Sequence, residues 1–186
     1  MLEPLDLTSA HLLSWSQPKA LHRAFELRDG DRLLGALSFV KAYGSLAEAS
    51  MAAGEWTFKR VGFLRPRVTV RRRGQETDLA IYQPKGWGAG GDLQFAGGRV
   101  YAWKSANFWS TKFDFVDVAG MTIIAFRPGM EESRWPDFFK FQALVEIDAS
   151  ARRLEELPLL LALGWYLMIL QHEDSASAGA VAATMG

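Results

Sequence analysis

The chain has 186 residues, of which 49% are hydrophobic, so it can bury one sizeable core, whereas two domains would each be small. Its 21 basic and 21 acidic residues cancel, so no overall field attracts nucleic acid, which is not an expected partner. The absence of cysteine excludes disulfides, thiolate catalysis and cysteine-ligated metals, and the first residues lack a basic segment leading into an apolar run. We therefore expect a single cytoplasmic domain.

Residues 1–19 contain Pro4 and Pro18 and have no clear period, which predicts an irregular lead-in anchored by Leu12, Leu13 and Trp15. From residue 20 the hydrophobic pattern has a period of two, and turn residues such as Asp29-Gly30 separate the apolar runs. The pattern predicts short strands at 21–28, 32–39, 45–52, 56–60, 67–73, 77–83, 92–95, 99–104, 113–118, 122–127 and 139–147. Many short strands with regularly spaced turns are typical of a β-sandwich or β-barrel.

The longest apolar stretch runs from Leu157 to Leu170 and predicts a helix over residues 154–172. Its large side chains cover the whole circumference, so the helix must lie inside a protein or inside a membrane. The apolar run spans about 21 Å, less than the roughly 30 Å of a hydrocarbon core, and acidic residues rather than basic ones flank it. Length and flanks favour a protein interior.

The buried helix favours a barrel over a sandwich. A helix is about 10 to 12 Å wide, and an eight-stranded barrel is already filled by its own side chains, so the barrel must have more strands and a wider lumen. We therefore predict a mostly β domain at residues 20–172, a closed antiparallel barrel of about twelve strands enclosing a central hydrophobic C-terminal helix. The small, weakly patterned residues at 173–186 are expected to form a flexible tail.

Several short motifs resemble those of bacterial proteins in the tubby C-terminal-like superfamily, which also contains the plant LURP-one-related proteins and the phospholipid scramblases. They are Gly44-Ser45-Leu46-Ala47-Glu48-Ala49, Trp56 to Phe63, Arg65-Pro66-Arg67-Val68, Asn107-Phe108-Trp109 and the terminal ELPLLLALGWYLMIL. The resemblance implies a twelve-stranded barrel around a C-terminal helix. It also implies phosphoinositide binding, as in tubby proteins, or scramblase-like action. A scramblase's proline-rich amino-terminal region and cysteine cluster are absent here, which counts against that activity.

The segment Gly54 to Arg73 holds seven basic residues against one acid, Glu55. If Val68 and Val70 point inward on a strand, then Arg67, Arg71 and Arg73 fall on the outer face. Lys59 points outward from the preceding strand, and guanidinium groups in a row suit phosphate. We predict an anion- or lipid-binding site at Lys59, Arg67, Arg71 and Arg73. The alternative is a solvated strand face whose charges meet Glu76, Asp78 and their neighbours across the sheet.

No motif predicts catalysis, a cofactor or a metal. Residues 86–91 match the spacing of a dinucleotide loop, but the pattern after them predicts a strand rather than the required helix. The three histidines have no ligand partner at suitable spacing, and no serine-nucleophile elbow is present.

The first functional hypothesis is therefore a non-catalytic binding module for anionic phospholipid or phosphoinositide head groups, or for another phosphorylated partner, at a membrane surface. The second is a membrane-associated, scramblase-like protein whose C-terminal helix inserts. The third is a structural or interaction protein of unknown role, and an enzyme ranks last because no acid, base, nucleophile or metal set assembles from these residues.

Overall fold

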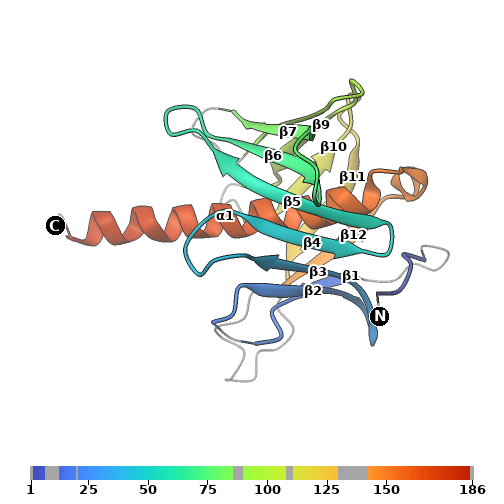
Figure 1. Ribbon diagram of the computed structural model, residues 1–186, viewed down its shortest axis with the longest axis horizontal. Helices are drawn as coiled ribbons and strands as arrows, with labels where there is room; N and C mark the ends of the chain where they lie inside the picture. Colours follow the sequence, from blue (N-terminus) through green and yellow to red (C-terminus); the bar gives the residue numbers. More distant parts are fainter. Residues whose placement is uncertain are drawn as a thin grey trace.

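A computed structural model describes residues 2–6, 13–19, 21–85, 90–107, 111–129 and 142–184. In these residues twelve strands form one closed antiparallel barrel, and helix α1 (Leu157–Thr184) runs through it (Figure 1). The strands are β1 (Leu13–Ser16), β2 (Ala24–Asp29), β3 (Arg32–Phe39), β4 (Ala47–Met51), β5 (Gly54–Val61), β6 (Arg67–Arg72), β7 (Asp78–Pro84), β8 (Gly91–Phe95), β9 (Val100–Ser105), β10 (Phe113–Val116), β11 (Thr122–Pro128) and β12 (Gln142–Ile147). The predicted fold class, a mostly β barrel around a C-terminal helix, is confirmed.

Each strand pairs with its neighbours in the sequence, and β1 closes the barrel by pairing with β12, from Leu13 opposite Val145 to Ser16 opposite Gln142. In such a barrel successive connections alternate between the two ends. The β1–β2, β3–β4 and β5–β6 connections lie at the end from which α1 leaves the barrel, here named the helix-exit end (Figure 1). The β2–β3, β4–β5 and β6–β7 turns lie at the opposite end, where α1 begins.

The structure differs from the sequence prediction at both ends of the chain. The predicted irregular lead-in contains β1, the strand that closes the barrel. Helix α1 begins at Leu157, after a 3₁₀ turn at Ala149–Arg153, and continues to Thr184 instead of ending near residue 172 before a loose tail. Alanine, which recurs in this segment, has the highest helix propensity and favours a helix even where no apolar face marks it. Residues 86–89, 108–109 and 139–141, which belong to other predicted features, lie outside the described residues.

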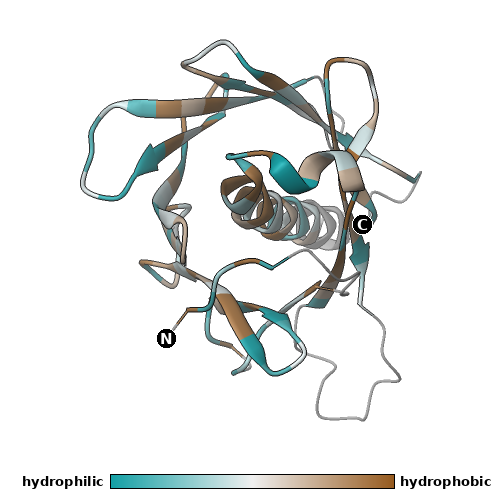
Figure 2. Ribbon diagram, turned by 90° about the vertical axis from the view of Figure 1, so that its right-hand side faces the viewer, coloured by the Kyte–Doolittle hydropathy of each residue, from teal (hydrophilic) through white to brown (hydrophobic). Residues whose placement is uncertain are grey.

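The apolar half of α1 lies inside the ring of strands, as Figure 2 shows in a view along the axis. Its side chains from Leu157 to Leu170 are buried or nearly so on every side. The indole rings of Trp165 and Trp15 are stacked with centroids 5.9 Å apart, and Tyr166 stacks on Phe39 at 5.7 Å. The all-round hydrophobicity of this segment is therefore explained by a β wall on all sides.

Gly164 allows α1 to approach the barrel wall closely at β10 and β11. A Cβ atom at this position would overlap the ring of Phe126 and would lie 3.1 Å from Cε2 of Phe115. Both rings are completely buried, and Phe126 also packs against Trp103 at 5.4 Å between centroids. A helix residue without a side chain is therefore required at this contact.

Candidate functional site

The four predicted site residues come from two neighbouring strands and the turn after them. Lys59 lies in β5, Arg67 and Arg71 lie in β6, and Arg73 follows β6 directly. Lys59 is paired with Thr69, so it lies between Arg67 and Arg71 on the outer face. The structure thus places all four along one pair of strands, with Lys59 and Arg67 toward the helix-exit end and Arg73 at the turn of the opposite end.

Ion pairs divide these four residues into two groups. Arg71 Nε lies 2.6 Å from Asp78 Oδ1, and the guanidinium of Arg73 lies 3.2 Å from Glu48 and 3.4 Å from Glu55. Among the described residues, Lys59 and Arg67 form no ion pair, and both are exposed. The alternative considered for this face was neutralisation of its cations by acidic residues across the sheet. It applies to Arg71, which is paired with Asp78, whereas Arg73 is paired with Glu48 and Glu55.

Lys59 and Arg67 stand at the helix-exit end, on either side of the β5–β6 loop. The shape of this loop depends on Gly62, whose φ is +88°, and a Cβ there would lie 2.7 Å from the carbonyl oxygen of Arg65. Arg65 is exposed within the loop and has no ion pair among the described residues. Arg60, at the end of β5, instead donates to both carboxylate oxygens of Asp174 in α1, at 2.9 and 2.7 Å.

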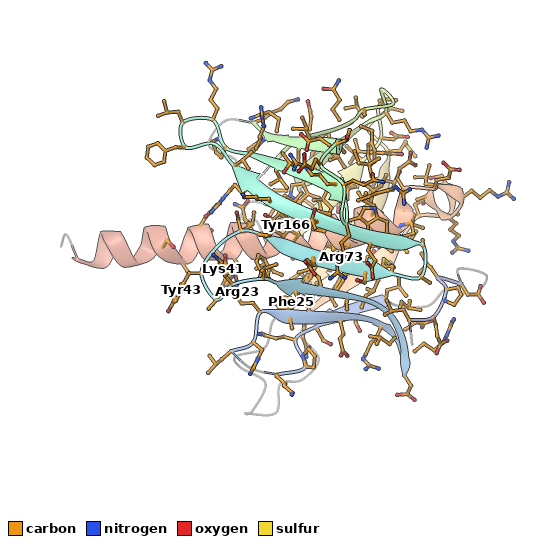
Figure 3. The ribbon with its side chains drawn as sticks, in the orientation of Figure 1. Arg23, Phe25, Lys41, Tyr43, Arg73 and Tyr166 are labelled. Atoms are coloured by element: carbon orange, nitrogen blue, oxygen red, sulfur yellow. The ribbon has the colours of Figure 1, made fainter. Side chains whose placement is uncertain are left out.

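The second basic loop at this end, β3–β4, is held by Arg23. One Nη of Arg23 donates to the carbonyl oxygens of Lys41, Ala42 and Gly44 at 3.2, 3.3 and 2.8 Å. The other lies 2.7 Å from Oε1 of Glu173 in α1. Arg23 thereby fixes the loop that carries Lys41 and ties it to the emerging helix (Figure 3).

Charge is distributed unevenly between the ends of the barrel. Around the helix-exit end, the described part of the chain has cations without an ion pair at Lys19, Lys41, Lys59, Arg65, Arg67, Lys104 and Lys112. The described carboxylates nearest this end are each paired with a cation, namely Glu48, Asp92, Asp114, Glu173 and Asp174. Described carboxylates without an ion pair, such as Asp31, Glu76 and Glu155, lie toward the opposite end together with the unpaired Arg72 and Arg153. A chain of zero net charge therefore has one positively charged end.

Sequence reasoning did not identify Lys41 and Arg65 as part of this positive region. Lys41 is an isolated charge in the sequence and joins the others only through the barrel topology. Arg65 lies within the basic segment that was recognised, but its position in a loop rather than on the strand face was not considered. The available signal was the Gly62 and Pro66 pair, which frames a loop containing Arg65.

A pocket of about 300 Å³ lies between α1 and strands β10 to β12, lined by Phe113, Trp165, Met168 and Ile169 with Gln171 and His172 at its polar side. Among the described residues that line it, His172 is the one titratable side chain, so these residues supply no acid–base pair. Among the described residues, no three His, Cys, Asp or Glu side chains come together as metal ligands. None of the helical segments described is both long enough and apolar enough to cross a bilayer.

Comparison with known proteins does not assign a function to these residues. No protein-family model, curated protein or solved structure matches the chain.

Proposed function

We propose that this chain is a non-catalytic module that binds anionic lipid head groups at the cytoplasmic surface of a membrane. The observation that carries the proposal is the group of unpaired cations at the helix-exit end, beside carboxylates that are already paired. The proposed contacts are Lys59 and Arg67 from the predicted site, together with Lys41 and Arg65.

The chemistry of these residues fits phosphate at a surface. Arginine is weakly hydrated and presents two N–H groups to one phosphate, whereas lysine acts as a compact point charge. Arg65 and Arg67 lie in and beside one short loop, and an anion held there meets no described carboxylate that lacks a cation of its own. Arg71 and Arg73 already hold carboxylates, so they are expected to contribute less.

The burial of α1 argues against function through helix insertion. Leu160, Leu161 and Leu163 have no exposed surface, because the barrel wall surrounds them. Insertion of this segment into a membrane would leave the barrel without its core. The resemblance to the tubby C-terminal-like superfamily supports the proposal, because the barrel and its enclosed helix agree with the fold expected from that resemblance.

The test is flotation of the full chain with vesicles of phosphatidylcholine alone, with added phosphatidylserine, and with added phosphoinositide at equal surface charge. The double variant Arg65→Gln/Arg67→Gln is compared with the matched control Arg72→Gln/Arg153→Gln. All four arginines lack an ion pair among the described residues, and the control pair lies at the opposite end. Basic residues near an anionic surface contribute about 1 kcal/mol each, so the first variant should bind about 30-fold more weakly.

The control should bind like the unaltered chain, and raising the salt concentration should weaken binding in all cases. An equal loss in both double variants would show that only overall charge matters and would refute the proposed site. Absence of binding to every vesicle would reject the lipid function and leave another phosphorylated partner or a purely structural role.

A further inference from the structure

We infer that the helix-exit end inserts apolar side chains into an anionic bilayer, with the barrel axis tilted away from the membrane normal because α1 projects from this end as far as Thr184 (Figure 1). This inference rests on the proposed lipid-binding function and adds the depth and orientation of binding. The inserting residues are Phe63 and Leu64 in the β5–β6 loop and Tyr43 in the β3–β4 loop.

These three side chains are almost fully exposed although each is large and apolar or aromatic. The exposed fractions are 97% for Phe63, 89% for Leu64 and 93% for Tyr43. A single exposed apolar residue needs no explanation, but three on two loops at one end of a barrel are a local concentration of exposed apolar groups. Val40, at the start of the β3–β4 loop, is also exposed and adds to this concentration.

The two loops are tied to each other and to the barrel core. The hydroxyl of Ser45 donates to the carbonyl oxygen of Arg60 at 3.2 Å, which joins the β3–β4 loop to the end of β5. The buried Tyr166 of α1 donates from its hydroxyl to the carbonyl oxygen of Ser45 at 2.6 Å. With Arg23 on three further carbonyl oxygens, the β3–β4 loop is held in place (Figure 3). Rigid attachment matters because loops that are already ordered lose less entropy on binding.

The charges around the apolar tips identify the occupant as an anionic bilayer. Lys41 and Tyr43 share one loop, and Lys59, Arg65 and Arg67 flank Phe63 and Leu64 in the other, all four cations without an ion pair among the described residues. Apolar side chains beside basic ones fit the boundary between acyl chains and anionic head groups, where aromatic rings and long cations both find suitable surroundings. A phosphate group free in solution would contact the cations and leave Phe63 and Leu64 exposed to water.

The opposite end supplies a matched control. Val118 is 88% exposed and Met121 is 64% exposed in the β10–β11 turn, so this end also has two exposed apolar residues on one turn. Asp117 lies next to Val118 and accepts hydrogen bonds from within its own turn. An apolar pair at the end without the positive region should not contact the membrane.

The first experiment compares flotation of Phe63→Ser/Leu64→Ser with that of Val118→Ser/Met121→Ser on phosphatidylserine-containing vesicles. The first variant should bind at least about tenfold more weakly, and the second should bind like the unaltered chain. All four positions are exposed, so both variants should retain the circular dichroism spectrum and the unfolding midpoint of the unaltered chain.

The second experiment measures depth directly and uses the absence of native cysteine. An environment-sensitive fluorophore is attached at Leu64→Cys or at Val118→Cys in the otherwise unaltered chain. On anionic vesicles the label at position 64 should shift to the blue and be quenched by lipids brominated along their acyl chains, and the label at position 118 should not change.

If the chain floats with anionic vesicles but the label at position 64 stays in water, and Phe63→Ser/Leu64→Ser binds normally, the insertion is wrong and the electrostatic function stands. If the unaltered chain does not float with any vesicle, both proposals are wrong. If both apolar double variants lose binding equally, contact through the helix-exit end is overturned.

Discussion

The substitution Gly164→Ala places two well-known effects in opposition. In an isolated helix this change stabilises by about 1 kcal/mol, because alanine favours helix formation over glycine. Here the added methyl group would overlap the ring of Phe126, which is fully buried and cannot move away without disturbing Trp103 and Phe115. Overpacking of a dense core costs about 1 to 3 kcal/mol, and the closeness of this overlap favours the upper part of that range or more. We therefore expect a net loss of about 2 kcal/mol in the free energy of unfolding.

Urea denaturation followed by circular dichroism measures this change through the denaturation midpoint, provided that the slope is unaltered. The matched test is the double variant Gly164→Ala/Phe126→Leu, in which a smaller side chain makes room for the methyl group. Phe126→Leu alone should also destabilise, since it leaves a cavity. The double variant should be clearly more stable than the sum of the two single changes predicts. If Gly164→Ala is neutral or stabilising, or the two changes are simply additive, the close-contact reasoning is refuted.

Two further predictions concern the buried helix and the buried tyrosines. Leu163→Asp should abolish folding, because an unpaired carboxylate at a fully buried position costs several kcal/mol. The control Ser177→Asp, on the exposed part of α1, should fold normally. Soluble yield and the circular dichroism spectrum distinguish the two outcomes. Burial raises the pKa of Tyr82 and of Tyr166 above the ordinary value of about 10, so their neutral forms favour folding below that pH and this contribution is lost as the pH rises toward the folded-state pKa. The free energy of unfolding should therefore fall above about pH 10, and less steeply in Tyr82→Phe/Tyr166→Phe; equal slopes in chemical denaturation would contradict this.

The sequence predicted most of the barrel because its strands carry strong local signals. Alternating apolar residues and glycine turns marked all the strands except β1, and the all-round apolar run from Leu157 to Leu170 indicated that the barrel had to enclose a helix. β1 went unrecognised because it is a short strand, Leu13–Ser16, close to Pro18. Four residues give too little alternation to detect, and what defines this strand is its pairing with β12 at the far end of the chain.

The candidate site was less predictable because it depends on distances that the sequence does not contain. The Arg71–Asp78 ion pair lies within one predicted hairpin, so register alone suggested it. The contact between Arg73 and Glu48 joins residues from non-adjacent strands, and no local pattern indicates it. The difference between paired Arg73 and unpaired Arg67 therefore emerged only from the folded structure.

Closure of the barrel through β1 and β12 also has a consequence for synthesis. The ribosome makes β1 early, but its partner β12 emerges only after more than a hundred further residues, and the helix that fills the lumen follows later still. Until then the nascent barrel has two unpaired edges and an unfilled apolar interior, both of which promote aggregation. Productive folding must wait until β12 and α1 have emerged, so we expect a chaperone to shield the open wall until then.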